Sequence, residues 1–304
     1  MKDNLVSKIA LGTAQWGMPY GIANTSGQPD LKMVRQILYL AAKSGIRTLD
    51  TARTYGSSES IIGKIISKSE IQFRIVTKLS PNIYEDDITK FEVLRRCKVS
   101  VDESLDSLRI NQIDTLLLHR GFHKNVRNGF IWEYLLQLKE IGLVKHLGIS
   151  AVNPEEAMEA LQDGSIDVIQ VATSVLDQRL LRLGFFKKAN ELGIEVHVRS
   201  LFLQGVAFIG IEELPPSMRA LAPKLSMIEK LAAENSIAPA VIWLDFASRL
   251  VASRLILGCE KKIQLAKNLE RILDLPIDPV IYQSLEVDDL PNNILDPSLW
   301  SRLS

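Results

Sequence analysis

The chain has 304 residues, of which 36 are basic and 36 acidic, so its formal net charge is zero. This balance gives no electrostatic reason to expect a nucleic acid or a membrane surface as a partner. A hydrophobic content of 46% is enough for a sizeable core, and the length allows one large domain or two smaller ones.

Short apolar runs rich in β-branched residues alternate with longer amphipathic runs along the chain. Several of the short runs are nearly continuous in Val, Ile and Leu, as expected of parallel strands buried on both faces. The strand candidates, in chain order, are Lys8–Gly12, Arg47–Asp50, Arg74–Lys78, Thr115–His119, His146–Ser150, Val168–Ala172, Glu195–Arg199 and Arg254–Leu257.

The longer runs predict helices between the strands. In Asp30–Ser44 and Phe91–Leu108 the apolar residues recur at spacings of three and four, which is the period of one helix face. Asp30 can cap the first helix, and Asn153 followed by Pro154 marks the start of another. Left-handed C-caps are expected at the glycines that follow a helical run and precede a strand, namely Gly45, Gly142 and Gly193.

Eight strand candidates, with a helix after nearly every one and no linker, predict a single α/β domain over residues 1–304 that folds as a (β/α)8 TIM barrel. A doubly wound sheet is the alternative, but it would normally carry a Gly-rich phosphate loop after its first strand. That position reads Gly12-Thr-Ala-Gln-Trp16-Gly17, with neither a GxGxxG pattern nor a Walker lysine, which favours the barrel.

Two segments exceed the repeating unit. Residues 201–217 form a long loop after the seventh strand, and residues 276–304 form an irregular C-terminal tail with several prolines. Long loops in compact domains tend to be lids or binding segments. The tail is either such a segment or a terminus that docks over one end of the barrel.

Titratable side chains follow three successive strands. In a barrel the C-terminal strand ends converge at one mouth, and here they carry Asp50, Lys78 and His119, with Tyr55 on the loop beyond Asp50. Taken alone, each has a structural explanation, such as an ion pair, a buried histidine or loop packing. Four such groups on three neighbouring strand ends indicate a catalytic site.

The order and spacing of these residues resemble the aldo-keto reductase superfamily, and the resemblance covers nearly the whole chain. It implies a (β/α)8 barrel and an NAD(P)(H)-dependent oxidoreductase that interconverts small-molecule carbonyls and alcohols. The motifs that carry it are Leu11-Gly-Thr-Ala14, Asp50-Thr-Ala-x-x-Tyr55-Gly, Thr77-Lys78, Asp114-x-x-x-x-His119, Gly148-Ile-Ser150, Gln170 and Gly258…Gln264-Leu…Asn268.

Carbonyl reduction explains each residue type. Hydride delivery builds negative charge on the carbonyl oxygen, so a proton donor must lie within hydrogen-bond reach. A phenol, with a pKa of about 10, is a poor acid at neutral pH, but a nearby ammonium favours the phenolate. Lys78 would supply the ammonium, and Asp50 the anion that a buried lysine needs. The resemblance implies the same roles, with Tyr55 as acid/base and His119 orienting the substrate.

The resemblance also implies the cofactor contacts. Ser150 and Gln170 match ligands of the nicotinamide carboxamide, although the usual asparagine after that serine is Ala151. Arg199 stands where an aromatic residue usually stacks on nicotinamide, and a guanidinium plane can stack as well. The other expected contacts are Gly12 and Thr13 after the first strand, Ser200, Leu201, Gln204 and Gly205 near the pyrophosphate, and Gly258, Glu260, Lys262, Gln264 and Asn268 towards the adenosine.

The choice between the two dinucleotides depends on the start of the last long helix. The family mostly favours NADPH, held by basic and hydroxyl groups around the 2′-phosphate. Lys261 and Lys262 can supply such groups at a helix N-terminus. Glu260 stands where a serine is common, and its carboxylate would repel phosphate but accept from a ribose hydroxyl. We therefore expect NADP(H), with NAD(H) as the alternative.

Aromatic and basic residues are expected around the substrate pocket. Trp16 and Tyr20 either offer ring faces to a sugar or aldehyde or pack the loop. Arg53 and Arg120 suggest a substrate that bears carboxylate or phosphate, and the alternative is surface solvation or a salt bridge to a loop acid. The expected rim comprises Trp16, Met18, Tyr20, Arg53, Arg120, Phe122 and the tail.

Two other functions remain open. Lys78 could form a Schiff base as in an aldolase, although Tyr55 and His119 fit that chemistry less well. The chain could also be a non-catalytic, redox-sensing subunit that binds a nucleotide. No metal site is expected, because the histidines and cysteines lack ligand spacing.

The expected compartment follows from what the sequence lacks. The two cysteines are Cys97 and Cys259, far apart in the chain, which suggests a reducing environment without disulfides. Residues 1–8 lack the apolar core of a signal peptide, and no apolar run reaches the roughly 18 residues that span a bilayer. We therefore expect a soluble cytoplasmic protein.

Overall fold

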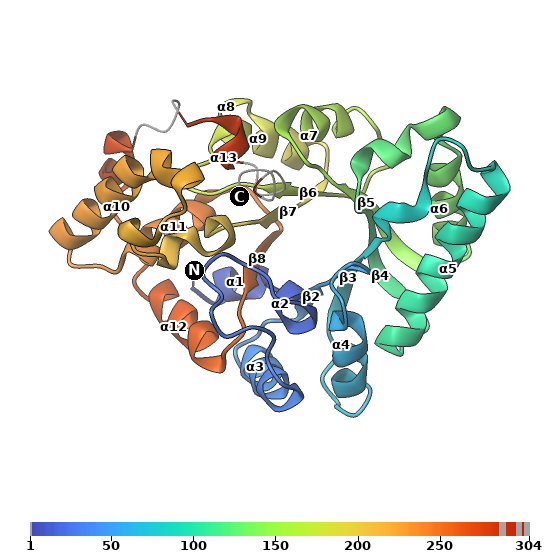
Figure 1. Ribbon diagram of the computed structural model, residues 1–304, viewed down its shortest axis with the longest axis horizontal. Helices are drawn as coiled ribbons and strands as arrows, with labels where there is room; N and C mark the ends of the chain where they lie inside the picture. The colour runs from blue at the N-terminus through green and yellow to red at the C-terminus, as the bar shows by residue number, and fades with distance from the viewer. Residues whose placement is uncertain (1, 286–289, 296–299, 301–304) are drawn as a thin grey trace.

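A computed structural model describes residues 2–285, 290–295 and 300 of the chain. Its eight strands are all parallel and form one closed barrel in chain order, because the last strand pairs back with the first (Figure 1). The strands are β1 (Ile9–Gly12), β2 (Thr48–Asp50), β3 (Arg74–Leu79), β4 (Ile113–Leu118), β5 (Val144–Ser150), β6 (Val168–Ala172), β7 (Glu195–Arg199) and β8 (Arg254–Gly258). The (β/α)8 barrel is confirmed, and the doubly wound alternative is wrong.

Helices lie around the outside of the barrel and between the strands in sequence (Figure 1). They are α1 (Lys2–Lys8), α2 (Ala14–Gly17), α3 (Leu31–Lys43), α4 (Ser58–Ile66), α5 (Lys90–Leu108), α6 (Phe130–Glu140), α7 (Pro154–Ala160), α8 (Arg179–Arg182), α9 (Phe185–Glu191), α10 (Ala222–Glu234), α11 (Pro239–Arg249), α12 (Lys262–Ile272) and α13 (Asn292–Leu295).

The predicted helix boundaries are confirmed by their caps. The Asp30 carboxylate accepts from the amide of Met33 at 2.7 Å, and the Asn153 side chain accepts from the amide of Glu156 at 2.8 Å. Each satisfies an amide that the first helical turn leaves unpaired. The three predicted C-cap glycines all have positive φ, as a left-handed C-cap requires.

Small differences from the predicted strands have local causes. Lys8 belongs to α1, so β1 begins one residue later than expected. His119 lies just beyond the last paired residue of β4, which leaves its side chain at the barrel mouth. Neither difference changes which strand carries which residue.

The barrel interior is polar at its N-terminal end. Arg74 on β3 forms an ion pair with Glu195 on β7 at 3.0 Å, and because these strands are not neighbours the pair crosses the interior. A small apolar cluster formed by Val76, Leu117 and Val168 also lies among the strands. The candidate site lies at the opposite end, where the strands have their C-terminal ends.

The two long segments contain short helical turns. The loop after β7 folds into three 3₁₀ helices, η4 (Leu203–Phe208), η5 (Ile211–Glu213) and η6 (Pro216–Leu221). The tail includes η7 (Pro279–Ser284) and α13, and its Tyr282 hydroxyl donates to Asp245 of α11 at 2.7 Å. The tail residues that the structure describes therefore dock on the helical layer, whereas residues 286–289, 296–299 and 301–304 lie outside the described part.

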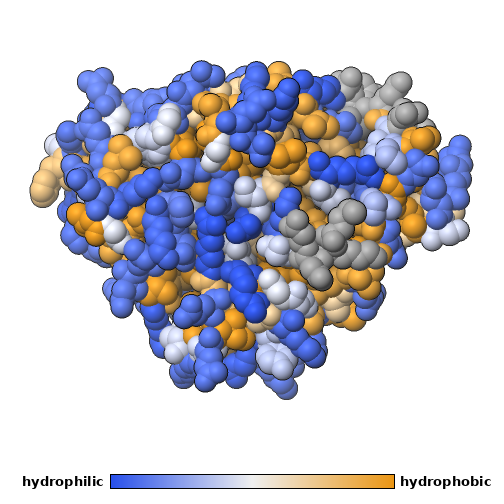
Figure 2. Space-filling model, turned by 180° about the vertical axis from the view of Figure 1, so that it is seen from behind, coloured by the Kyte–Doolittle hydropathy of each residue, from blue (hydrophilic) through white to orange (hydrophobic). Residues whose placement is uncertain are grey.

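The outer surface mixes residue types. On the face that Figure 2 presents, hydrophilic and hydrophobic residues are interleaved. Among the described residues, no helix combines the length and the apolar character needed to cross a membrane.

Candidate active site

Asp50 and Lys78 form a buried ion pair at adjoining strand ends. Lys78 Nζ donates to Asp50 Oδ1 at 2.7 Å and to the carbonyl of Thr51 at 2.9 Å. The two residues are only 1% and 4% exposed. Burial opposes the charge of Lys78, but Asp50 and then Tyr55 outweigh it, so the pKa of this lysine is raised above its usual value. Lys78 is therefore a stable ammonium at physiological pH.

Gln170 completes the coordination of the Asp50 carboxylate. It lies on β6, across the barrel from β2, and its Nε2 donates to Asp50 Oδ2 at 2.6 Å. Its Oε1 lies 3.5 Å from the hydroxyl of Ser150 on β5. Both residues were predicted to contact nicotinamide, but neither lines the cavity described below. Gln170 thus contacts Asp50 across the barrel, and the Ser150 hydroxyl contacts Gln170.

Tyr55 lies on the loop between β2 and α4, with its ring beside Lys78. The ammonium is 4.9 Å from the ring centroid. This loop packs tightly on α2, because a Cβ on Gly17 would lie 1.7 Å from the carbonyl oxygen of Tyr55. Gly17 also accepts from the amide of Ser57 at 3.2 Å. Only a glycine permits this approach, so α2 helps to fix the loop that carries the phenol.

His119 faces Tyr55 from the end of β4. The two rings meet edge to face, with centroids 6.1 Å apart, and Nδ1 of the imidazole lies 3.2 Å from the hydroxyl of Thr54. Burial, followed by the charges of Lys78 and Arg199, lowers the pKa of His119 to about 3. The imidazole is therefore neutral at physiological pH, with one N–H available as a donor. The structure thus brings the four predicted catalytic residues together.

A cavity of about 380 Å³ runs from Tyr55 to α12 at this mouth of the barrel. Its volume falls within the range typical of small-molecule sites. The predicted residues that line it are Gly12, Thr13, Tyr20, Asp50, Tyr55, Arg199, Ser200, Leu201, Gln204, Gly205, Gly258, Glu260, Gln264 and Asn268. The other predicted site residues do not line it, namely Trp16, Arg53, Lys78, His119, Arg120, Ser150, Gln170 and Lys262.

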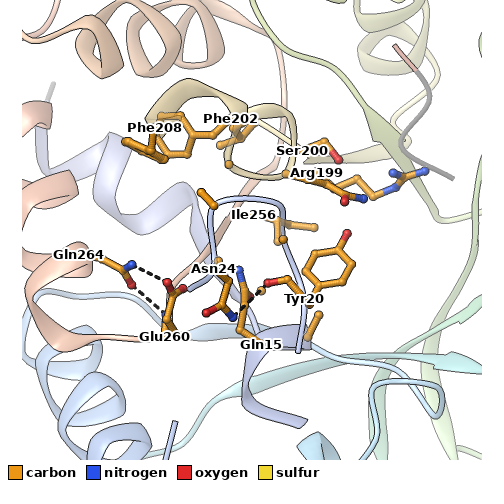
Figure 3. Close-up of a pocket in the computed structure, with 18 of the residues that line it drawn as sticks. Gln15, Tyr20, Asn24, Arg199, Ser200, Phe202, Phe208, Ile256, Glu260 and Gln264 are labelled. Atoms are coloured by element: carbon orange, nitrogen blue, oxygen red, sulfur yellow. Dashed lines mark hydrogen bonds between the residues drawn. The ribbon is translucent and has the colours of Figure 1, made fainter. Parts of the chain in front are cut away.

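The first and seventh β–α loops meet over the cavity. The amide of Ile22 donates to the carbonyl of Gln204 at 3.1 Å, and a Cβ on Gly205 would lie 2.8 Å from that of Ala23. The φ of Gly205 is +102°, a conformation open to glycine. Figure 3 shows Arg199, Ser200, Phe202 and Phe208 on one side of the cavity, with Gln15, Asn24 and Glu260 on the other. The cavity is thus covered by the loops that follow β1 and β7, and residues after β8 complete its lining.

Glu260 and Gln264 form the wall at the α12 end. Gln264 Oε1 accepts from the amides of Glu260 and Lys261, each at 2.9 Å, and its Nε2 donates to Glu260 Oε1 at 2.7 Å (Figure 3). Farther along the same helix, Arg271 donates to Asn268 at 2.8 Å. This end of the cavity therefore combines amide groups with charges of both signs.

Several lining residues are missing from the sequence prediction. Lys267 and Arg271 follow Gln264 by three and seven positions, so the helical repeat alone would have placed them on the same face of α12. Phe202 and Phe208 pack against each other in the loop after β7, with tilted rings and centroids 4.7 Å apart. An irregular loop gives no periodic signal that would identify such a pair.

The four candidate substrate residues have different surroundings. Trp16 is fully buried and donates from Nε1 to the carbonyl of Cys259 at 2.9 Å, so it packs the loop. Tyr20 lines the cavity, and burial followed by the nearby Tyr55 raises its pKa to about 12. Arg120 is exposed and does not line the cavity.

Arg53 forms a salt bridge to acidic residues, which is the alternative to contacting a substrate. Its guanidinium contacts Glu59 and Glu103, each at 2.5 Å. Arg53, two residues before Tyr55, is therefore paired with acids and does not line the cavity. Arg199 is instead the arginine that lines the cavity beside Tyr55.

Comparisons with known proteins agree with this geometry. A model of the Aldo/keto reductase family matches residues 8–285. The chain is 27% identical over 262 residues to an uncharacterized oxidoreductase of Bacillus subtilis, an alignment that covers 77% of this chain and 80% of the relative. It is 27% identical to the NADH-specific methylglyoxal reductase of Escherichia coli, covering 67% and 66%. It is also 27% identical to the chloroplastic pyridoxal reductase of Arabidopsis thaliana, covering 63% of this chain but only 55% of that protein.

Solved structures share the fold at low sequence identity. The holo form of an aldo-keto reductase from Bacillus halodurans superposes with a TM-score of 0.73 at 20% identity, covering 94% of this chain and 95% of that one. A putative aldo-keto reductase from Pseudomonas aeruginosa gives a TM-score of 0.65 at 21% identity, covering 88% and 90%. With the family match over most of its length, the chain belongs to the aldo/keto reductase family of oxidoreductases, which act on small-molecule carbonyls with nicotinamide cofactors.

Proposed function

We propose that this protein reduces an aldehyde or a ketone to an alcohol with NADPH, and that Tyr55 donates the proton. The observation that carries the proposal is the position of the Lys78 ammonium, 4.9 Å from the centre of the Tyr55 ring at the edge of the cavity. Loss of a proton leaves a phenolate, and an adjacent fixed cation stabilises that anion. The same cation has no obvious purpose if Tyr55 only packs the loop.

The other catalytic residues support this transfer. The paired Asp50 carboxylate keeps Lys78 charged, and Gln170 holds the second oxygen of that carboxylate. The neutral imidazole of His119 can donate one N–H to a carbonyl oxygen, which orients it and draws electron density from the carbon. Tyr55 and His119 then approach the same oxygen from two sides, as their edge-to-face contact allows.

The cavity suits a dinucleotide. It is lined by backbone, hydroxyl and amide groups, and its lining includes both Tyr55 and residues of α12. When bound there, the reduced nicotinamide would supply the hydride. The residues that would hold the cofactor are Gly12, Thr13, Ser200, Leu201, Gln204, Gly205, Gly258, Glu260, Gln264 and Asn268.

Preference for NADP(H) is supported by the cations at the α12 end. Lys267 and Arg271 line this part of the cavity, whereas Lys262 does not. One acid, Glu260, opposes a phosphate there, but it already accepts from Gln264 at 2.7 Å. Two cations against one engaged carboxylate favour the additional phosphate of NADP(H).

An anionic carbonyl substrate is supported by Arg199. Its guanidinium lines the cavity beside Tyr55 and donates to the carbonyl of Ala151 at 3.2 Å. Within the described part of the chain, no carboxylate pairs with it. A half-buried cation without a counter-ion favours a ligand that brings one, such as a carboxylate or a phosphate.

The proposal is tested with a panel of aldehydes, ketones and sugars, both neutral and anionic, monitored by NADPH consumption. We expect turnover of several carbonyls and faster turnover of the anionic ones. A protein that binds the dinucleotide but turns over no member of the panel would instead be a nucleotide-binding regulatory subunit. Schiff-base aldolase chemistry needs a neutral amine, which the ion pair of Lys78 with Asp50 disfavours. Trapping with borohydride should therefore give no adduct at Lys78.

A further inference from the structure

A second buried acid lies behind the catalytic pair and has no part in the chemistry described above. Glu59 belongs to the first turn of α4 and is only 2% exposed. Its side chain does not line the cavity and contacts none of the four catalytic side chains. A carboxylate in such surroundings costs free energy unless it is paired and hydrogen-bonded, so its partners matter.

Three elements of the fold donate to this one carboxylate. The hydroxyl of Thr77 on β3 donates to Oε1 at 2.6 Å, and the hydroxyl of Ser104 on α5 donates to the same oxygen at 2.9 Å. The guanidinium of Arg53, on the loop that carries Tyr55, donates to Oε2 at 2.5 Å. Both oxygens of Glu59 are therefore satisfied by residues from outside its own helix.

Two of these donors are close in sequence to catalytic residues. Thr77 directly precedes Lys78, and because side chains alternate along a strand, it points out of the barrel where Lys78 points in. Arg53 lies between Asp50 and Tyr55 in sequence, and its amide donates to the carbonyl of Lys78 at 3.3 Å. The contacts form a closed ring that runs from Lys78 to Arg53, through Glu59 to Thr77, and back to Lys78.

We propose that Glu59 is a positioning residue that holds the Tyr55 loop in register with the strand of Lys78. The inference rests on the proposed function, in which the distance between phenol and ammonium decides the rate. An apolar residue could pack α4 against β3 and α5 at no greater cost, because buried ion pairs are often replaceable by apolar side chains without loss of stability. Hydrogen bonds to the charged Glu59 instead fix both the direction and the distance between the Tyr55 loop and β3.

If this closed ring of contacts positions Tyr55, breaking it should lower kcat and leave the binding of carbonyl and cofactor unchanged. In Glu59→Gln the amide keeps an oxygen for Thr77 and Ser104 but loses the charge that holds Arg53. We expect kcat for the best carbonyl of the panel to fall by about tenfold to a hundredfold, as small misplacements of reacting groups do. KM for that carbonyl and the Kd for NADPH should stay within about twofold. Arg53→Met should behave in the same way.

Two further variants separate positioning from general destabilisation. Glu103→Gln removes the other, more exposed partner of Arg53 and leaves the ring intact, so its kcat should stay within about twofold of wild type. The double variant with Glu59→Gln and Arg53→Met should be no slower than either single variant by more than about twofold, because both break the same link. Normal kcat in folded Glu59→Gln, losses that multiply in the double variant, or an equal loss in Glu103→Gln would each overturn the proposal.

A further variant and a further measurement keep the proposal testable if Glu59→Gln does not fold or if the wild type shows no turnover. If Glu59→Gln does not fold, Thr77→Val removes one hydroxyl of the ring with little change in volume, and a normal kcat there overturns the proposal. The register of the loop is also read without any substrate, from the hydrogen exchange of the Arg53 amide, which donates to the carbonyl of Lys78. This amide should exchange faster in Glu59→Gln than in Glu103→Gln, because only the loss of the charge on Glu59 opens the closed ring of contacts. An unchanged exchange rate in Glu59→Gln overturns the positioning role, whereas absence of turnover in the wild type together with faster exchange in Glu59→Gln would overturn only the proposed function.

Discussion

Gln170 donates to Oδ2 of Asp50 at 2.6 Å, from the opposite side of the barrel, while Lys78 holds Oδ1 of the same carboxylate at 2.7 Å. The carboxylate is thus fixed between a cation and an amide, and its direction is set by strands that are far apart in sequence. Asp50 is only 4% exposed, and a buried acceptor without a partner lowers the stability of the fold. Both contacts therefore stabilise the folded protein.

We expect the contact with Asp50, rather than a contact with the cofactor, to decide the effect of replacing Gln170. In Gln170→Met the second oxygen of Asp50 loses its donor, and the hold on Lys78 weakens. We expect kcat to fall by about tenfold, equivalent to about 1.4 kcal/mol of transition-state stabilisation, with the Kd for NADPH within about twofold. Steady-state kinetics and fluorescence titration of the cofactor measure the two quantities. A large rise in that Kd with little change in kcat would show that Gln170 binds the nicotinamide carboxamide instead.

Replacement of Tyr55 by Phe should abolish carbonyl reduction. The variant keeps the ring beside Lys78 and removes only the proton donor, and general acids contribute about 10² to 10⁴ in rate. We expect kcat to fall within that range while NADPH binds with a Kd within about threefold of wild type. Single-turnover oxidation of bound NADPH by a reactive carbonyl provides the measurement. Turnover close to that of wild type would remove Tyr55 from the mechanism.

The cations on α12 should decide between the two dinucleotides. Lys267→Ala and Arg271→Ala are each expected to weaken NADPH binding by about tenfold, and to change the Kd for NADH by less than about twofold. Glu260→Gln should strengthen NADPH binding, because it removes the one negative charge at this end of the cavity. Lys262→Ala is the matched control, since Lys262 does not line the cavity. Tighter binding of NADH than of NADPH by the wild type would reverse the proposed preference.

Arg199 should lower KM for negatively charged substrates. In Arg199→Gln the cavity loses its cation beside Tyr55, and we expect KM for a carboxylated aldehyde to rise by about tenfold or more, as for other charge-assisted contacts. KM for a neutral aldehyde of similar size should change by less than about twofold. An equal effect on both substrates would point to a contact with the cofactor instead.

The parts of the site that follow from local pattern could be predicted from the sequence. The ends of β2, β3 and β4 are marked by apolar runs, and barrel topology then brings Asp50, Lys78 and His119 to one mouth. Caps such as Asp30 are equally local, because the capping group and its amide are three residues apart.

Side-chain pairings over long distances could not be predicted in this way. Arg53 pairs with Glu103, 50 residues away, and Gln170 reaches Asp50 over 120 residues. Knowing that a residue ends a strand does not tell which way its side chain points or which group from a distant strand meets it. For Arg53, the direction of the side chain decides between a substrate contact and a structural ion pair.

Buried histidines should make the fold sensitive to acid. Burial, with a smaller contribution from Arg120, lowers the pKa of His123 to about 4, whereas an unfolded histidine titrates near about 6.5. Between these values the unfolded chain binds a proton that the folded chain does not, so the free energy of unfolding falls as the pH is lowered through this window. Urea unfolding at about pH 7.5 and about pH 5.5 measures the loss. In His123→Leu the difference between the two pH values should be smaller than in the wild type, because one of the groups that drives it is gone. Equal differences in the two proteins would mean that His123 binds its proton as readily in the folded state as in the unfolded one.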